Sequence, residues 1–214
     1  MRANGGTGRR ARLKIVFRKK WEFDSLFAHQ KIMNLDSLNN LIELFSYQAD
    51  KQNKKKVFLQ WLNPNNKKTY SWGETQTNIL KLSKTIKENI KEGDRWLLVS
   101  ENRQEWFVSD LAIMLSDGIT VPAYTTYTEE DYKYLIEDCE PSLVIVSNNE
   151  LLKKLSKTID EKDFILKVIT LDDVNEVTNN LNLIRKEKYL NFSTLIKDNL
   201  LEKDKIQNNK LKRN

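Results

Sequence analysis

Cysteine, histidine, proline and glycine are all scarce in this chain of 214 residues, which has one cysteine, one histidine, three prolines and six glycines. The single cysteine, Cys139, cannot form an internal disulfide, which favours a reducing compartment and predicts a cytoplasmic protein. One cysteine and one histidine, His29, are too few for a zinc site. No apolar run reaches the roughly 18 residues that a membrane-spanning helix needs. These absences argue against disulfide-stapled, zinc-binding and membrane-spanning proteins.

Acidic residues are missing from the first twenty positions, which carry eight basic side chains. That end accounts for the net charge of +6, because residues 21–214 hold 28 basic and 30 acidic groups. A charge excess confined to one end does not indicate a basic binding face, so we expect no nucleic-acid partner. We interpret residues 1–37 as a basic leader and linker that is disordered or non-native. A genuine basic tail and a transit peptide stay open as alternatives.

Glycine is scarce where a nucleotide-binding protein would need it. Gly5-Gly6-Thr7-Gly8 has no strand pattern before it and no helical pattern after it, so a flexible tail is favoured over a phosphate-binding loop. The basic stretch 14–20 is likewise assigned to the leader rather than to contact with anionic lipid or RNA. After residue 20 the only glycines are Gly73, Gly93 and Gly118, each isolated. Residues 201–214 form a polar, lysine-rich tail.

Between these ends, apolar periodicity predicts alternating helices and strands. The expected strands are 57–61, 69–71, 96–99, 119–123, 143–146 and 165–171. The expected helices are 38–45, one from Ser71 to near Gly93, 104–117, 129–138 and 151–155. The turn residues 63–66 predict a hairpin between the first two strands, and Ser71 with Glu74 predicts a capping box. Strands separated by helices predict βαβ units, hence an α/β fold with a mostly parallel sheet.

Seven short segments stand in an order that resembles one enzyme family. They are NLIELF (40–45), TYSWGE (69–74), KEGDR (91–95), SENR (100–103), DGITVPAY (117–124), YLIED (134–138) and LVIVS (143–147). This series resembles the N-terminal part of long-chain fatty acid–CoA ligases, acyl-CoA synthetases of the AMP-binding, adenylate-forming superfamily. The resemblance implies that residues 38–200 are the N-terminal portion of an AMP-binding domain, an incomplete part of the large domain.

The resemblance also implies a reaction. ATP and a fatty acid form an acyl-adenylate and pyrophosphate, with Mg²⁺ balancing phosphate charge, and the thiol of CoA then displaces AMP. In the family this reaction depends on a Gly/Ser/Thr-rich phosphate loop, a ribose-binding acid and a catalytic lysine. We find no residue of this sequence that matches any of these three features. We therefore expect no catalytic, cofactor-binding or metal-binding residues, no tight binding of ATP, Mg²⁺ or CoA, and no activity from this chain alone. In the intact enzyme, peripheral membrane contact is expected. The alternative is a stand-alone, non-catalytic α/β binding or scaffold module.

Three acidic or polar groups invite a functional interpretation, and each has a simpler one. Ser100-Glu101-Asn102 follows a buried strand, where α/β proteins place ligand sites, yet a helix-capping role is favoured. Asp172-Asp173 also follows a strand, and we favour a loop or cap role. Glu129-Glu130-Asp131 is expected to complement a helix dipole.

The remaining candidates are expected to be structural. Cys139 lacks positive neighbours in the sequence, and His29 is expected on a surface or linker. The tryptophans at 61, 72, 96 and 106 are expected in the core. Gln104 stands where the family usually has proline, at small cost to a helix start. Ser116-Asp117 replaces small apolar residues, which is expected to loosen packing. A sheet that lacks its remaining strands is expected to expose an edge and an apolar face.

Overall fold

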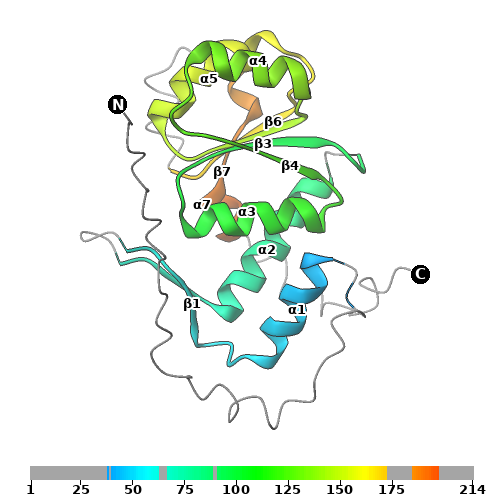
Figure 1. The fold of residues 1–214 in the computed structure, drawn as a ribbon, viewed down its shortest axis with the longest axis vertical. Helices are drawn as coiled ribbons and strands as arrows, with labels where there is room; N and C mark the ends of the chain where they lie inside the picture. Colours follow the sequence, from blue (N-terminus) through cyan, green and yellow to red (C-terminus); the bar gives the residue numbers. More distant parts are fainter. Residues whose placement is uncertain (1–37, 39, 63–66, 89–90, 173–184, 198–214) are drawn as a thin grey trace, which may run out of the picture. The chain divides into compact units, whose positions relative to one another are not determined.

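The computed structural model describes residues 38, 40–62, 67–88, 91–172 and 185–197. The chain divides into two units, Met1–Leu38 and Asn39–Asn214, and the fold below belongs to the second (Figure 1). Our predictions for residues 1–37 and 201–214, for the turn at 63–66 and for Asp173 fall outside the described residues.

The first elements of the fold are two helices joined through a hairpin. They are α1 (Leu41–Lys51), β1 (Val57–Gln60), β2 (Thr69–Ser71) and α2 (Trp72–Lys87). The strands pair antiparallel, which confirms the predicted hairpin arms. The predicted capping box is also present, because Glu74 N–H donates to Ser71 Oγ at 3.2 Å and Ser71 N–H donates to Glu74 Oε2 at 2.7 Å. This reciprocal pair starts α2 directly at the end of the hairpin.

A parallel five-stranded sheet forms the centre of the fold, in the order β4-β3-β5-β6-β7. Its strands are β3 (Arg95–Val99), β4 (Ile119–Ala123), β5 (Leu143–Val146), β6 (Lys167–Thr170) and β7 (Tyr189–Asn191). The connecting elements are α3 (Gln104–Leu115), α4 (Glu129–Cys139), α5 (Asn149–Glu161), the 3₁₀ turn η2 (Lys186–Lys188) and α7 (Phe192–Lys197). The predicted α/β class and parallel sheet are confirmed.

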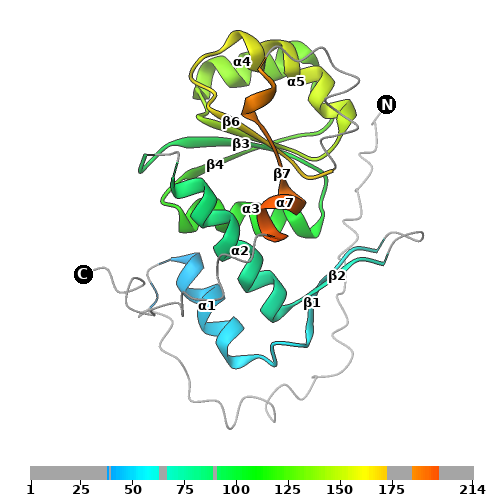
Figure 2. The same cartoon turned by 180° about the vertical axis from the view of Figure 1, so that it is seen from behind.

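Helices cover both faces of this sheet because successive strand residues point to opposite sides. On β3, Trp96 and Leu98 face the core shared with α1, α2, α3 and α7, whereas Leu97 and Val99 face α4 and α5. Figure 2 shows these helix layers on either side of the strands. Helices cover both faces of the inner strands, contrary to the uncovered apolar face that we expected. The expected exposed edge is present at β4, where no residue is buried and Ile119 is 53% exposed.

Element boundaries differ from prediction where glycines were used as stop signals. Helix α2 ends at Lys87 rather than near Gly93, and α3 ends at Leu115 rather than at Asp117. The left-handed residue after α3 is Asp117, with φ of 64°, whereas Gly118 has an ordinary φ. Gly118 stands in a tightly packed place, since a Cβ there would lie 3.1 Å from Ile113 Cγ2. Helix α5 is longer than the predicted 151–155.

Ser116 tightens the packing that we expected it to loosen. Its side chain is buried, and its Oγ lies 2.7 Å from the Ala112 carbonyl oxygen and 3.1 Å from the Ser83 carbonyl oxygen. The second contact links the end of α3 to α2, so the polar residue acts as a tie between two helices. The expectation was wrong because a serine hydroxyl can satisfy a backbone carbonyl that an apolar residue cannot.

Candidate functional site

The strand order defines where a ligand site is expected. The chain runs from β3 to its neighbour β4, then crosses to the other side of β3 to form β5. The segments that follow β3 and β5 therefore leave the sheet in different directions, which makes this carboxyl edge a topological switch point. Residues 100–103 follow β3, and Ser147 with Asn148 follow β5. Two of the polar groups singled out in the sequence, 100–102 and Asp172, lie along this edge.

Polar side chains tie the two segments together across the switch point. Asn148 Nδ2 donates to Glu101 Oε1 at 2.7 Å, while Asn148 Oδ1 caps α5 by accepting from Leu151 N–H at 3.0 Å. Ser100 Oγ donates to its neighbour's carbonyl oxygen at 2.9 Å. The predicted capping role for 100–102 is wrong, because the N-cap of α3 is Arg103 and it makes no side-chain cap hydrogen bond.

The strongest electrostatic feature is a buried carboxylate, Glu105, in the first turn of α3. Its side chain is 1% exposed. Arg103 Nε donates to its Oε2 at 2.8 Å, Tyr70 OH donates to its Oε1 at 3.2 Å, and Lys68 Nζ also donates to Oε1. Arg103 in turn donates through Nη1 to Asp172 Oδ1 at 2.9 Å. The network joins β2, α3 and the segment after β6.

Burial and pairing act in opposite directions on the pKa values of this network. Burial raises the pKa of Glu105, but the hydrogen bonds from Arg103 and Lys68 outweigh it and leave the pKa below its ordinary 4.5. Burial lowers the pKa of Arg103, but Glu105 and Asp172 raise it above its ordinary value. Burial and the adjacent Glu105 carboxylate raise the pKa of Tyr70. Both members of the pair are therefore charged at neutral pH, as a structural ion pair is.

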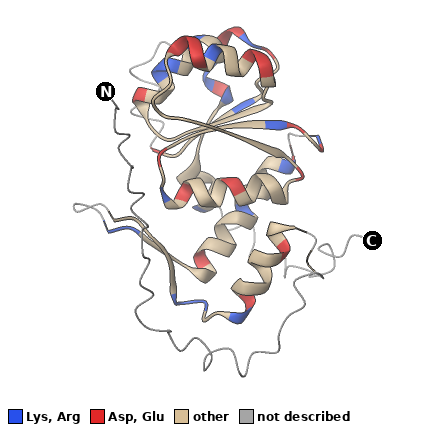
Figure 3. Ribbon diagram, viewed as in Figure 1, with Lys and Arg blue, Asp and Glu red and all other residues tan. Residues whose placement is uncertain are grey.

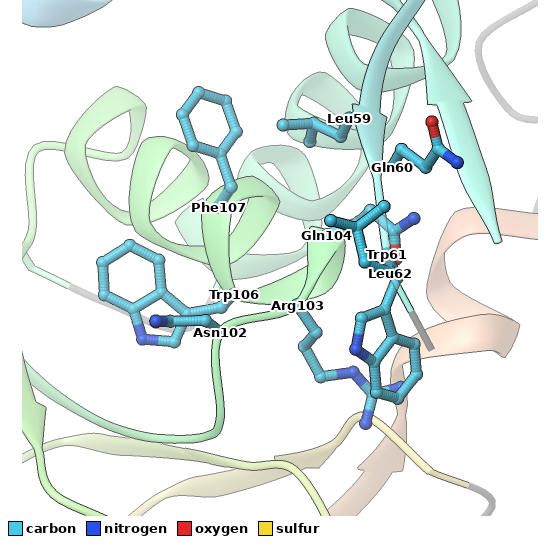
Figure 4. Close-up of a pocket in the computed structure, with 9 residues that line it drawn as sticks. All are labelled: Leu59, Gln60, Trp61, Leu62, Asn102, Arg103, Gln104, Trp106 and Phe107. Carbon is cyan, nitrogen blue, oxygen red and sulfur yellow. The ribbon is translucent and has the colours of Figure 1, made fainter. Parts of the chain in front are cut away.

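Beside this network lies an open groove of about 490 Å³, between the end of β1 and the start of α3 (Figure 4). It is lined by Leu59, Gln60, Trp61, Leu62, Asn102, Arg103, Gln104, Trp106 and Phe107. Behind it, Phe107 packs edge-on against Phe58 at 5.4 Å between ring centroids, and Phe58 stacks on Trp72 at 3.8 Å. The apolar back of the groove therefore belongs to the core.

The predicted core position holds fully for Trp96 and partly for Trp72 and Trp106, of which Trp106 also lines the groove, and it fails at Trp61. Trp96 is fully buried, and Trp72 and Trp106 pack against the core. Trp61 lies in the groove instead, with the Arg103 guanidinium 5.2 Å from its ring centroid (Figure 4). The error arose because a large aromatic residue after a strand has the same sequence signature in a core as on a groove wall.

The other predicted structural residues lie away from the groove. Glu129, Glu130 and Asp131 occupy the first turn of α4, where Thr128 and Asp131 form a capping box, which confirms the helix-start interpretation. Burial raises the pKa of the Cys139 thiol above its ordinary value. Arg95 does contact the Cys139 carbonyl oxygen, a positive neighbour that the local sequence did not reveal.

Asp172 pairs with Arg103 across 69 residues of sequence rather than capping a helix. Sequence reasoning also missed Glu105, whose neighbours in the network are separated from it by up to 67 residues. Among the described residues, no group of three or more His, Cys, Asp or Glu side chains is arranged to hold a metal ion. None of the described helices has the length and apolar character needed to cross a bilayer.

Strand order, two-sided helix layers and a polar switch point define a doubly wound α/β protein. A sequence profile described as AMP-binding enzyme matches residues 45–209, well over half of the chain. The chain therefore belongs to the AMP-binding enzyme family.

Among curated relatives, Long-chain-fatty-acid–CoA ligase ACSBG2 of Xenopus laevis is 29% identical over 72 residues, 34% of this chain and 10% of the relative. Long-chain-fatty-acid–CoA ligase FadD15 of Mycobacterium tuberculosis is 27% identical over 86 residues, 39% of this chain and 14% of the relative. The matched segment thus spans a small part of each relative.

Solved structures show the same fold. A mutant of coronafacic acid ligase from Pectobacterium brasiliense has a TM-score of 0.62 at 19% identity, covering 74% of this chain and 29% of that one. The anthranilate CoA ligase AuaEII, solved with anthranoyl-AMP, has a TM-score of 0.58 at 18% identity, covering 74% of this chain and 28% of that one. The fold is that of adenylate-forming enzyme domains.

Proposed function

We propose that this chain carries the first part of the AMP-binding domain of a long-chain fatty acid–CoA ligase. The observation that carries the proposal is the family profile over residues 45–209, together with two relatives that are both named long-chain-fatty-acid–CoA ligases. In the reaction proposed, a fatty acid carboxylate attacks the α-phosphate of ATP and releases pyrophosphate. The thiol of CoA then attacks the acyl-adenylate and releases AMP.

The described residues do not fit the nucleotide and magnesium parts of that reaction. A triphosphate cradle needs successive backbone N–H groups turned inward, which glycine-rich segments supply. Gly73 is the second residue of α2, and a Cβ there would lie 3.0 Å from the Lys54 carbonyl oxygen, so this glycine serves packing. With no carboxylate cluster among the described residues either, we derive no step through Mg²⁺. We predict that the chain alone is catalytically inactive and does not bind ATP, Mg²⁺ or CoA tightly.

We propose that this chain forms the edge of the sheet at which the carboxyl ends of β3, β5 and β6 lie, and keeps the segments that follow these strands in place. The hydrogen bond between Asn148 and Glu101 and the ion pair between Arg103 and Asp172 fix the segments after β3, β5 and β6 to one another. Such an edge is where α/β proteins place ligands, which supports a contribution to a substrate cleft. We propose a cytoplasmic location, with peripheral membrane contact by the intact enzyme. Figure 3 shows both charge signs on α4 and α5, which does not favour a nucleic-acid surface.

Two measurements test this function. The first is the nucleotide sequence beyond codon 214: continuation into a Ser/Thr/Gly-rich segment supports the ligase, whereas a stop codon with normal expression supports a stand-alone binding or scaffold module. The second is palmitate-dependent exchange of labelled pyrophosphate into ATP. We expect background exchange from the 214-residue chain and exchange well above background from the extended reading frame. Exchange by the short chain overturns its predicted inactivity, and none from the extended protein overturns the ligase.

A further inference from the structure

The hairpin of β1 and β2 and the loop before it carry positive charge with no acidic residue to balance it. Residues 51–73 contain no aspartate or glutamate and six lysines, which are Lys51, Lys54, Lys55, Lys56, Lys67 and Lys68. Acidic residues elsewhere offset these lysines, so the near-neutral total for residues 21–214 does not reveal the segment. In Figure 3 the described parts of the two hairpin arms carry blue and no red.

Most of these lysines have no acidic partner. Lys54 lies 3.1 Å from Asp50, and Lys68 pairs with Glu105. The other four form no ion pair with any residue that the structure describes, and they are Lys51, Lys55, Lys56 and Lys67. All four are exposed. The segment therefore presents uncompensated positive charge to the solvent.

Exposed apolar side chains lie among these lysines. Leu62 follows β1 and is 83% exposed, the highest value among the large apolar side chains in the described part of the chain. Val57 begins β1 directly after Lys56 and is 51% exposed. Trp61 N–H donates to the Lys68 carbonyl oxygen at 3.0 Å, which brings Leu62 to the same end of the hairpin as Lys68. Each exposed apolar residue therefore has lysines as near neighbours.

This combination fits the surface of an anionic bilayer better than the other partners of a basic segment. Lysines attract anionic headgroups, and exposed aliphatic side chains enter the boundary between headgroups and acyl chains. A nucleic acid would use the lysines but would gain nothing from an exposed leucine, and residues 51–73 contain no arginine for bidentate contact with phosphate. A covering protein segment would have to supply carboxylates for four cations, because burying them unpaired is costly.

We propose that the described residues within 51–73 form a contact surface for an anionic lipid bilayer, with the unpaired lysines at the headgroups and Leu62 in the acyl-chain boundary. This surface would make the peripheral membrane contact proposed above for the intact enzyme, so the inference rests on that part of the proposed function. A fatty acid ligase would meet its substrate there, because long acyl chains partition from water into bilayers.

Binding is measured by sedimentation of the full chain with sucrose-loaded vesicles of phosphatidylcholine containing about 30% phosphatidylglycerol. We expect binding about tenfold or more tighter than to vesicles of phosphatidylcholine alone. Residues 1–20 hold eight basic side chains and attract the same vesicles, but they are identical in every variant below. The place of contact is therefore judged from differences between variants. No binding to the anionic vesicles overturns the proposal.

Charge reversal at two places separates the hairpin segment from net charge. Lys55→Glu/Lys56→Glu reverses two unpaired lysines before β1, and Lys153→Glu/Lys157→Glu reverses two exposed lysines of α5. Both double variants lower the net charge of the chain equally. We expect the first to weaken vesicle binding by about tenfold or more and the second by about threefold or less, because charges beyond a Debye length from the bilayer are screened. Equal effects of the two overturn the proposal.

A neutral substitution tests insertion of the apolar side chain. Leu62→Asn is expected to weaken vesicle binding by about fivefold or more, whereas Leu166→Asn changes another exposed leucine, outside the segment, and should bind as the parent chain does. Circular dichroism confirms that each variant is folded. Unchanged binding by Leu62→Asn indicates a surface for polyanions in general, nucleic acids included, and overturns the proposal.

The same variants are compared in the protein from the extended reading frame. If neither the hairpin lysines nor Leu62 affects vesicle binding there, the rest of the protein covers the segment, and the proposal is overturned. Pyrophosphate exchange is measured without vesicles. A ligase that exchanges pyrophosphate but shows no hairpin-dependent vesicle binding therefore refutes the membrane surface alone, and hairpin-dependent binding without exchange refutes the ligase alone.

Discussion

Replacing Glu105 by leucine tests whether the buried network holds this domain together. In the parent chain the Glu105 carboxylate accepts from Arg103 Nε at 2.8 Å and from Tyr70 OH at 3.2 Å, and it pairs with Lys68. Leucine removes every one of these contacts. The Arg103 side chain, 8% exposed, then keeps only Asp172 as its carboxylate partner. A nearly buried cation loses the closer of its two counter-charges.

The expected loss of stability follows from the burial of the pair. Removing one partner of a buried ion pair costs about 3–5 kcal/mol, because the other charge is left desolvated and uncompensated. Asp172 stays within 2.9 Å of Arg103 and is half exposed, so it offers partial compensation. We therefore expect a loss at the lower end, about 3 kcal/mol. For a chain of this length that corresponds to a fall in Tm of roughly 6–12 °C.

The assay is urea unfolding of the full chain followed by tryptophan fluorescence, with the double variant Arg103→Met/Glu105→Leu as the internal control. If the cost comes from a stranded cation, removing that cation as well should recover about 1–3 kcal/mol. The reasoning is refuted if Glu105→Leu lies within about 0.5 kcal/mol of the parent chain. It is equally refuted if the free energy of unfolding lost by the double variant equals the sum of the losses in Arg103→Met alone and Glu105→Leu alone.

The same pair of chains predicts a pH dependence with a definite sign. The pKa of Glu105 is lowered in the folded state from its ordinary 4.5, so below that value the unfolded chain takes up the proton first. The stability that Glu105 contributes is complete above pH 4.5 and is lost as the pH falls through the folded-state pKa. The stability gap between parent and Glu105→Leu should therefore narrow below pH 4.5. A difference in free energy of unfolding between the parent and Glu105→Leu that grows as the pH falls contradicts this prediction.

Three further changes have defined outcomes. Gln104→Pro should fold with a free energy of unfolding within about 1 kcal/mol of the parent. Proline is accepted there because position 104 is the first residue of α3 and Arg103 before it has extended dihedrals of −141° and 167°. A loss above about 3 kcal/mol in urea unfolding contradicts this. Asn148→Ala removes the cap of α5 and the bond to Glu101, and should cost about 1–2 kcal/mol in thermal unfolding, whereas an unchanged Tm contradicts it. Cys139 is buried with a raised pKa, so iodoacetamide should alkylate it about tenfold or more slowly in the folded chain than in urea, and equal rates contradict this.

Features that are set locally were predictable from the sequence. The apolar runs at Trp96–Val99 and Leu143–Val146 predicted strands, and the structure has strands there that are buried on both faces and lie inside the sheet. The Ser71–Glu74 spacing predicted a capping box that is present. In each case the signal depends on neighbours within a few residues. Strand β7 has only three residues and offers no such signal, so it was not predicted.

Features set by distant contacts were not predictable. The Arg103–Asp172 pair exists because β3, β5 and β6 are adjacent and end at the same edge, which brings together residues 69 positions apart. Glu105 looked like an ordinary acid in the first turn of a helix. Its burial follows from Lys68 and Tyr70, which the hairpin places against α3. No periodicity within α3 contains that information.

Helix α3 is tied to neighbouring elements at both of its ends. At its start Gln104 Nε2 donates to the Lys68 carbonyl oxygen of the hairpin segment, and just after its end the Ser116 hydroxyl lies 3.1 Å from the Ser83 carbonyl oxygen of α2. Both ties join α3 to elements outside the sheet, whereas the Arg103–Asp172 pair joins its start to the sheet edge. The groove wall carried by α3 is therefore positioned from two directions. Because each tie is a single hydrogen bond worth about 1 kcal/mol, losing one should loosen the wall without unfolding the domain.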